Sequence, residues 1–415
     1  ANTPGPPPRL PGSPAGTEDN DAVNKAQLDA VAAAMGDDNA YLSVEGEGDG
    51  SDNALATGDN AAALGANPVA NGTESIAMGS NSYADGAQTT ALGSGSLALG
   101  EGATATGAGT TALGEFSTAS GYGAVAEGVG SAAVGTNAYA AGSSSFAGGD
   151  SAQANGGASV ALGAGSISNG SLGVSIGGNA QNNGFFAVAI GGLSLADAPF
   201  SVAIGGFAMA GAWQSTAVGS GAYAEGYNST SIGAGSTAGG GGVAIGAGAQ
   251  SGYWFFDETT GENSYIATSG TAVGQDAKAT GQFSTALGGF SDGSFSSAGA
   301  AGAYSTALGA GAYAGSYWDS TLVGDYTTAV GAESWAIGGS ATSLGFNSFA
   351  QADNATVLGA NAWTTADASN AVALGQGSYG DRANSVSVGA SAEWTDAAGV
   401  VHAAVDRQIT NVAAG

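Results

Sequence analysis

Ser159-Val160-Ala161-Leu162-Gly163 is one copy of a pattern that runs through most of this 415-residue chain. Glycine recurs at every seventh position from Gly58 to Gly191, and alanine stands two places before nearly all of these glycines. A period of seven is too short for a helix and a turn, but it suits a short strand followed by a glycine corner. So strict a repeat predicts an all-β solenoid rather than a globule with a pocket.

The residue before each glycine shows that the true unit has fourteen residues. It is apolar in one heptad, as at Leu162, and often polar or acidic in the next, as at Asn169. Leu99 and Leu113 break the polar series, and Thr106 is one of two breaks in the apolar series. We therefore expect coils of fourteen residues, each built from two unlike strands.

Strand alternation sorts the side chains of each coil onto two faces. Ser159, Ala161 and Gly163 share a face of small residues that must line a narrow interior, whereas Val160 and Leu162 share the other face. That apolar face is too long to remain in water, so we expect it to pack on the same stripe of other chains, with the polar outward face of the second strand toward solvent. Three chains form the simplest ring with a filled centre, although two remain possible. The expected interchain core comprises Val160, Leu162, Ile176, Ile190, Ile204, Val218 and Ile232.

The charge balance limits the partners of this chain. It has 33 acidic and five basic residues, a net charge of −28, which repels nucleic acid and bare anionic membrane. The acids read as a solvated surface that keeps a long rod soluble. Divalent-cation bridging at Glu45, Glu47, Asp49 and Asp52 is the alternative, but this run matches no calcium-loop spacing. We predict no metal site and no cofactor.

Residues suited to catalysis are scarce. Cysteine is absent, and His402 is the only histidine, so any nucleophile–histidine arrangement would depend on it alone. The glycines form no phosphate loop, because no Gly-Lys-Ser/Thr step leads into a helix. No apolar run approaches the roughly 18 residues of a membrane helix. We expect a non-enzymatic protein without catalytic residues, in which His402 is a packing or surface residue.

Composition divides the chain into four segments. Residues 1–16 are proline-rich and read as a flexible leader. Residues 17–40 are helix-prone, with coiled-coil-like apolar spacing, and would need partner helices. Residues 41–395 carry the repeat, with a first strand at 41–44, and would form about 24 coils on the order of 115 Å long. Residues 404–415 close the chain.

Two stretches depart from the repeat, near 250–268 and 390–403, and both resemble hairpins. Thr260-Gly261 stands near the turn of the first. Consecutive aromatic residues on an excursion need a partner surface, which is either the roll, a neighbouring chain or a ligand. The candidate ligand contacts are Tyr253, Trp254, Phe255 and Phe256. Outward aromatic residues of the repeat are a second group, which either contacts a partner or covers neighbouring coils and grooves between chains: Tyr83, Tyr139, Phe146, Trp213 and Tyr223.

Three features of the sequence resemble trimeric autotransporter adhesins, the YadA-like surface proteins of Gram-negative bacteria. The repeat at 158–166 and 370–378 is similar to their head repeat, and residues 21–28 are similar to the helix that completes a preceding neck. Residues 407–415 resemble the neck that joins a head to a coiled-coil stalk. The neck residues would be Arg407, Gln408, Ile409, Asn411 and Val412.

The resemblance implies a left-handed parallel β-roll, three chains around one axis, and display on the outer membrane through an anchor beyond Gly415. It also implies an adhesin head that attaches to host matrix, cells or abiotic surfaces, with collagen, fibronectin and laminin as candidate partners. Family head repeats have been implicated in collagen binding, but we interpret the matching Val and Leu positions here as scaffold. The alternative is a rigid spacer that projects a more distal head. An ice- or mineral-binding solenoid would need the same Thr or Asp at one outward position in every coil, and the outward residues here vary too much. A phage fibre is a further alternative, which the neck motif argues against.

Overall fold

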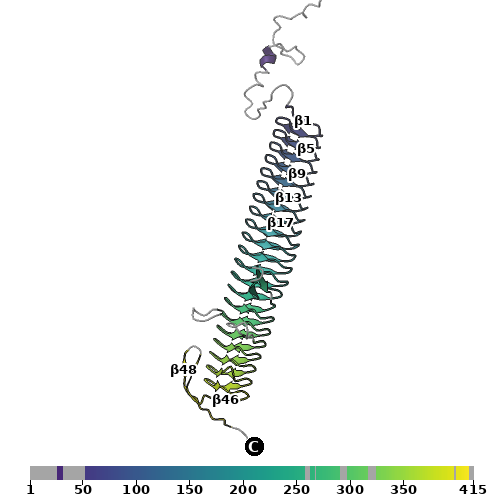
Figure 1. The fold of residues 1–415 in the computed structure, drawn as a ribbon. Helices are drawn as coiled ribbons and strands as arrows, with labels where there is room; N and C mark the ends of the chain where they lie inside the picture. The colour runs from purple at the N-terminus through teal and green to yellow at the C-terminus, as the bar shows by residue number, and fades with distance from the viewer. Residues whose placement is uncertain are drawn as a thin grey trace, which may run out of the picture.

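The computed structural model describes residues 26–30, 52–257, 262–266, 268–289, 297–315, 324–396 and 399–410. From Leu55 onward the chain winds into an elongated rod of stacked coils, and β46 lies at its far end (Figure 1). Residues 26–30 form a short piece of helix. The strand predicted at 41–44 lies outside the described residues, and the coiled-coil assignment of 17–40 remains a prediction.

Each coil contributes one strand to each of two ladders of 22 strands. All pairings in the ladders are parallel; for example, Val160 pairs with Val174 and Leu162 with Ile176. Every repeat position therefore lies directly over its copy in the next coil, which confirms the predicted solenoid of fourteen-residue coils. The described rod has 22 coils rather than the expected 24, because hairpins and longer loops take up the remaining residues.

The first ladder consists of two-residue strands. Its members are β1 (Leu55–Ala56), β3 (Val69–Ala70), β5 (Tyr83–Ala84), β7 (Leu97–Ala98), β9 (Thr111–Ala112), β11 (Val125–Ala126), β13 (Tyr139–Ala140), β15 (Gln153–Ala154), β17 (Ile167–Ser168), β19 (Gln181–Asn182), β21 (Leu195–Ala196), β23 (Met209–Ala210), β25 (Tyr223–Ala224), β27 (Thr237–Ala238), β29 (Gln250–Ser251), β33 (Lys278–Ala279), β35 (Gly299–Ala300), β37 (Tyr313–Ala314), β39 (Trp335–Ala336), β41 (Phe349–Ala350), β43 (Trp363–Thr364) and β45 (Tyr379–Gly380).

The second ladder consists of three-residue strands, except for its last member. Its members are β2 (Ala62–Leu64), β4 (Ile76–Met78), β6 (Thr90–Leu92), β8 (Thr104–Thr106), β10 (Thr118–Ser120), β12 (Ala132–Val134), β14 (Phe146–Gly148), β16 (Val160–Leu162), β18 (Val174–Ile176), β20 (Val188–Ile190), β22 (Val202–Ile204), β24 (Thr216–Val218), β26 (Thr230–Ile232), β28 (Val243–Ile245), β32 (Thr271–Val273), β34 (Thr285–Leu287), β36 (Thr306–Leu308), β38 (Thr328–Val330), β40 (Thr342–Leu344), β42 (Thr356–Leu358), β44 (Val372–Leu374) and β46 (Val386–Ser387).

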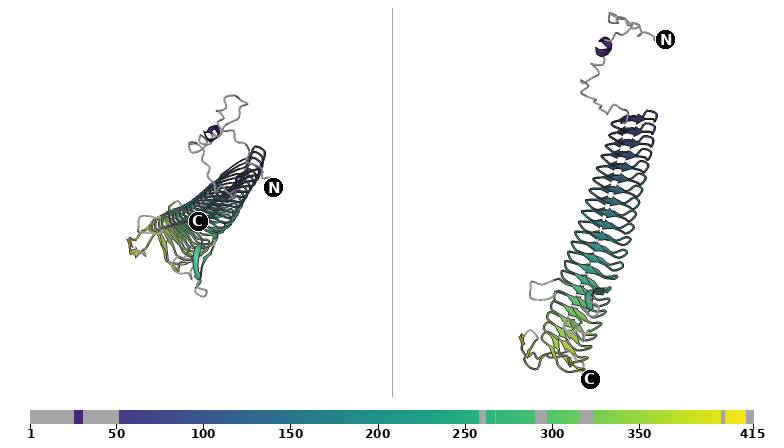
Figure 2. Two further views of the ribbon diagram at one scale, coloured as in Figure 1. Left: turned by 90° about the horizontal axis from the view of Figure 1, so that it is seen from above. Right: turned by 45° about the horizontal axis from the view of Figure 1, so that its top comes forward.

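Two antiparallel hairpins lie outside the ladders. β30 (Tyr253–Asp257) pairs with β31 (Glu262–Ile266), and β47 (Trp394–Thr395) pairs with β48 (Val401–His402). The second hairpin lies beside the C-terminal coils in both views of the rod (Figures 1 and 2). The first hairpin and two longer connections, one between Lys278 and Gly299 and one between Thr306 and Thr328, interrupt the regular repeat, and the second hairpin follows the last coil.

The interior of the rod is thin and filled by small side chains. Ala161, Ser159 and Ser166 are completely buried, and alanine dominates the buried apolar residues. Val357 is the largest fully buried side chain among the described residues. A core this narrow buries little apolar surface per coil, so the backbone ladders and the surfaces outside the coil carry much of the stability.

The outward face of the two-residue strands corrects one expectation. The sequence predicted a polar face there, but most of the outward residues are apolar and half-buried, as in the stack of Leu195, Met209 and Tyr223. The polar column lies just beside it, where the Asn155 amide donates to the Asn169 side chain at 2.7 Å and Asn169 donates to Asn183 at 2.8 Å. The sequence analysis inferred the polarity of this face from the residue before each glycine. That residue belongs to the polar column and gives no information on the apolar column beside it.

One coil has an unusually large residue in its core, opposite a position without a side chain. Asn182 occupies a slot that holds alanine in most coils, and its amide donates to the Ala187 carbonyl. Its Oδ1 has no hydrogen-bond partner among the described residues. The opposing slot holds Gly173, where a Cβ atom would lie 2.7 Å from Asn182 Oδ1. The large residue is accommodated because the facing position has no side chain.

We expect Gly173→Ser alone to destabilise the chain by about 2 kcal/mol, because its side chain would overlap the Asn182 amide. Adding Asn182→Ala removes the side-chain overlap and the unsatisfied oxygen and leaves only the close approach to the Gly170 carbonyl, so the double variant should regain most of the lost stability. Urea unfolding of both single variants and the double variant measures the coupling. If the changes in unfolding free energy of the two single variants simply add in the double variant, Gly173 and Asn182 are not coupled and this explanation is wrong.

Candidate functional site

The predicted interchain core lies on the outward face of the three-residue ladder. Val160 stacks on Val174, Leu162 stacks on Ile176, and the same register continues to Ile232. Leu162 is 44% exposed in the single chain and Ile204 is 37% exposed, so water reaches a continuous apolar stripe. We call this column of residues the apolar stripe. The structure holds one chain, and the role of the stripe between chains remains a prediction.

The predicted ligand contacts lie on the first hairpin. Tyr253, Trp254, Phe255 and Phe256 belong to β30, and Trp254 pairs with Tyr265 across the hairpin. The hairpin is inserted between β29 and β32, at the turn that joins a two-residue strand to the next three-residue strand. The side chains of this hairpin lie outside the described part of the structure, so their role as contacts remains a prediction.

Other aromatic residues singled out in the sequence fall on different surfaces. Tyr83, Tyr139 and Tyr223 are the outward residues of two-residue strands, whereas Phe146 lies on the face of the apolar stripe. Trp213 lies in a turn. They therefore form no single site, although each belongs to a column that runs along the rod.

Two of these tyrosines face glutamates. The Tyr139 hydroxyl donates to Glu127 Oε2 at 2.6 Å, and this hydrogen bond raises the pKa of Tyr139 above its ordinary value. Burial, together with the Glu225 carboxylate, raises the pKa of Tyr223. Both phenols therefore stay protonated at neutral pH and act as hydrogen-bond donors to the neighbouring glutamates.

A stacked column of aromatic rings covers the C-terminal coils. The rings of Phe349 and Trp363 are 4.1 Å apart and nearly parallel, and Trp335 lies 5.9 Å from Phe349 on the other side. Trp394 of the second hairpin stacks on Tyr379 at 4.9 Å. The hairpin therefore continues a column that the solenoid begins. The sequence analysis did not predict this column, because it did not consider the stacking of rings from successive coils.

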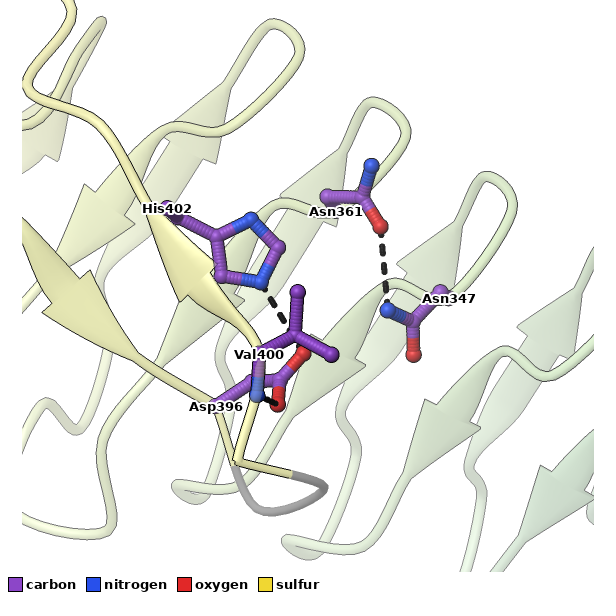
Figure 3. Close-up of polar contacts among 5 residues, drawn as sticks. All are labelled: Asn347, Asn361, Asp396, Val400 and His402. Atoms are coloured by element: carbon purple, nitrogen blue, oxygen red, sulfur yellow. Dashed lines mark hydrogen bonds and ion pairs between the residues drawn. The ribbon is translucent and has the colours of Figure 1, made fainter.

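His402 is fixed inside the second hairpin. Its Nε2 lies 2.9 Å from Asp396 Oδ2, and the other carboxylate oxygen accepts a hydrogen bond from the Val400 amide at 2.8 Å (Figure 3). The imidazole ring stacks on Trp394 at 4.2 Å. Asp396 is 3% exposed and His402 13% exposed. These contacts order the hairpin and give the histidine a packing role.

The first residue of the predicted neck, Arg407, contacts the last coils of the rod. The Arg407 guanidinium donates to Ser378 Oγ at 2.9 Å and to the Val388 carbonyl at 2.6 Å, and also reaches the Gln376 carbonyl. Gln408 and Ile409 are exposed. Asn411 and Val412 lie outside the described residues. The assignment of all five residues to a neck remains a prediction.

The turns that follow the two-residue strands carry a group of residues that the sequence analysis mostly missed. We call this group the aromatic edge: Phe185, Phe186, Phe200, Trp213 and Tyr227. Their signal was an aromatic residue one or two places after the second glycine slot of a coil, where small or polar residues stand in many other coils. Only Trp213 was identified, because the turns were treated as connectors.

The geometry of these turns makes aromatic residues costly. Phe186 has φ 55° and Phe200 has φ 58°, in the left-handed region. That conformation costs a bulky residue roughly 1–2 kcal/mol, whereas asparagine and glycine adopt it more readily. Asn60, Asn228 and Asn354 occupy the same turn position in other coils. Phe186 and Phe200 therefore stand in a backbone conformation that disfavours bulky side chains.

The described residues contain no group of three or more His, Cys, Asp or Glu side chains arranged to hold a metal ion. Within the same residues, no helix has the length and apolarity needed to cross a membrane. The candidate surfaces are instead columns and edges that repeat from coil to coil. Such an arrangement defines a solenoid with extended contact surfaces.

Comparison with known proteins identifies the family. The sequence matches the YadA head domain repeat over more than half of its length, so the chain belongs to that family and is an adhesin-type head domain. The matched residues are 70–96, 93–117, 114–138, 126–150, 183–208, 214–236, 266–291, 323–348, 336–362 and 350–378.

Among solved structures, the chain is similar to the crystal structure of the collagen-binding domain of the Yersinia adhesin YadA. The two share 21% sequence identity with a TM-score of 0.15, over 67% of this chain and 76% of that chain. No curated protein matches the sequence. Membership of the family rests on the repeat matches.

Proposed function

We propose that this chain is the adhesive, non-enzymatic head of a homotrimeric fibre on the bacterial outer membrane. The observation that carries the proposal is the run of YadA head repeats along a 22-coil rod. Its surfaces are extended columns, which suit contact with a large partner better than capture of a small molecule.

The apolar stripe supports the trimer. Leu162, Ile204 and Ile232 are each more than a third exposed, and similar residues recur along the rod. A monomer would leave this stripe in water, at a cost of about 25 cal/mol for each Å². Three copies around an axis bury the stripe from end to end and leave the two-residue ladder outward.

Attachment would be multivalent. A trimer presents three copies of every surface site, and many fibres on one cell act together, so weak contacts add up to strong attachment. The partners we propose are matrix proteins such as collagen, fibronectin or laminin, or an abiotic surface. The net charge of −28 argues against nucleic acid as a partner.

The first hairpin is the candidate contact. We expect a trimer-stabilised chain to bind at least one surface in a panel of collagen, fibronectin, laminin and plastic. Replacing Trp254, Phe255 and Phe256 by alanine should reduce that binding at least tenfold, because large aromatic residues dominate interface energies. A Val400→Ala/Val401→Ala variant, which changes exposed residues of the other hairpin, is the matched control.

The results separate adhesion from a spacer role. Binding that survives in the aromatic variant would remove the hairpin as the contact site but keep the head adhesive. No binding of the wild-type trimer to any surface would contradict the adhesive proposal. It would favour a rigid spacer, which the neck-like segments near both ends of the chain support.

A further inference from the structure

The aromatic edge is a continuous group of rings on successive coils. Phe186 and Phe200 stack with their centroids 5.7 Å apart, and Trp213 lies 6.4 Å from Phe200 and 5.5 Å from Tyr227. Phe185 packs edge-on against Phe186 at 4.3 Å. All five side chains are nevertheless at least 40% exposed. The rings contact one another along the rod and still present a large apolar area to water.

The same side of the rod carries further aromatic residues. Phe283, Tyr304 and Tyr326 occupy the equivalent turns beyond the first hairpin, and the two tyrosine rings are 5.2 Å apart and nearly parallel. They are 50–62% exposed. The first hairpin enters at this edge, between the two groups. Aromatic rings are thus concentrated along one edge of the central coils.

Two observations indicate that these rings contact a binding partner. Phe186 and Phe200 adopt the left-handed backbone conformation that asparagine takes in other coils, so they are retained at a cost to folding. Their rings are also uncovered. A group that served only to stabilise the coil would be better buried.

The charge around the aromatic edge indicates the chemistry of the partner. Exposed Asp197 and Glu225 stand at the entrance to the turns of Phe200 and Tyr227, three and two residues before these rings. No lysine or arginine occurs anywhere between Lys25 and Lys278. The edge therefore combines aromatic rings with an uncompensated negative field, which attracts cations.

We propose that the aromatic edge binds arginine side chains of an extended basic polypeptide. A guanidinium group stacks on aromatic rings and pairs with a carboxylate at the same time, and it is more weakly hydrated than an ammonium group. Rings on successive coils allow several arginines of one segment to bind together. The inference rests on the proposed adhesive function, for which it names a class of partner.

The test compares oligo-arginine and oligo-lysine peptides of equal length on the full chain. A variant replaces Phe186 and Phe200 by Asn, and Phe185, Trp213 and Tyr227 by Ser, residues that the repeat itself uses in these turns. The variant keeps the net charge of −28, so general electrostatic attraction is unchanged. Phe116→Asn is the control, because Phe116 has the same turn position and φ 57° but belongs to neither ring group.

In about 0.15 M salt we expect the wild-type chain to bind oligo-arginine about tenfold more tightly than oligo-lysine. The five-residue variant should lose this preference while its affinity for oligo-lysine stays the same. The Phe116→Asn control should keep the preference. Fluorescence anisotropy of labelled peptides measures both dissociation constants.

Three results would overturn the proposal. One is an arginine preference that persists in the variant, and another is an equal loss in the Phe116→Asn control. The third is dissociation of the oligomer in the variant during sedimentation, which would mean that a second copy of the chain covers the edge. Binding of the wild-type chain to matrix proteins is measured in parallel. If the wild-type chain binds no matrix protein, only the proposed adhesive function is contradicted, because the peptide assay does not depend on matrix binding.

Discussion

Leu162→Asp together with Ile190→Asp is expected to convert the proposed trimer into monomers. Both residues lie in the apolar stripe, with Ile176 between them in the ladder. Each substitution would place three carboxylates close together in the proposed interchain core. An unpaired buried charge costs several kcal/mol, so the combined cost exceeds what a contact between chains withstands.

Sedimentation equilibrium at micromolar concentration measures this outcome. Gln181→Asp is the matched control, because Gln181 is the exposed outward residue of β19 on the other ladder. The control should remain trimeric, since its new charge faces solvent. A double variant that stayed trimeric would show that the apolar stripe does not hold the chains together.

Gly219→Ala is expected to destabilise the chain by about 3 kcal/mol or more, although it adds a single methyl group. Gly219 has φ 133°, which side-chain-bearing residues avoid, and a Cβ atom there would lie 2.6 Å from the carbonyl oxygen of Gly233 in the next coil. The neighbouring atoms are backbone of the ladder, so they cannot move aside without breaking the stack.

A second glycine in the same turn provides the control. Gly221 has φ 64° and open space around its Cβ position, and Asn179 occupies the equivalent place with φ 54°. Gly221→Asn should therefore change stability by less than about 0.5 kcal/mol. Thermal unfolding of both variants tests the contrast. Equal effects would mean that close approach of the coils is not the reason for the glycine period.

The periodic residues allowed most of the fold to be predicted. Alternation through Val160, Ala161 and Leu162 correctly assigned the inward and outward faces, because each side chain position repeats over its copy in the next coil. The small interior followed from the same alternation. The family then followed from the repeat, since few sequences keep a glycine period for so long.

The outward apolar column and the aromatic edge were harder to predict because they depend on residues outside the glycine pattern. Ile167 lies three places before a glycine, so a reading based on the residue before glycine missed the outward apolar column. The aromatic edge arises from contacts between Phe186, Phe200 and Trp213, which are separated by about one coil each and meet only after the coils are stacked. The packing of Trp394 on Tyr379 likewise depends on how the last hairpin folds back.

The direction of the strands determines how this rod responds to a pull. Hydrogen bonds between coils, such as that from the Val160 amide to the Gly173 carbonyl at 2.9 Å, point along the long axis. Stacked coils carry the same tension in series, so the rod yields one coil at a time as the few bonds between two neighbouring coils break. Each opened coil would release roughly 45 Å of chain. A cell held by such rods under flow would be attached by tethers that lengthen in steps and dissipate energy before the anchorage itself fails.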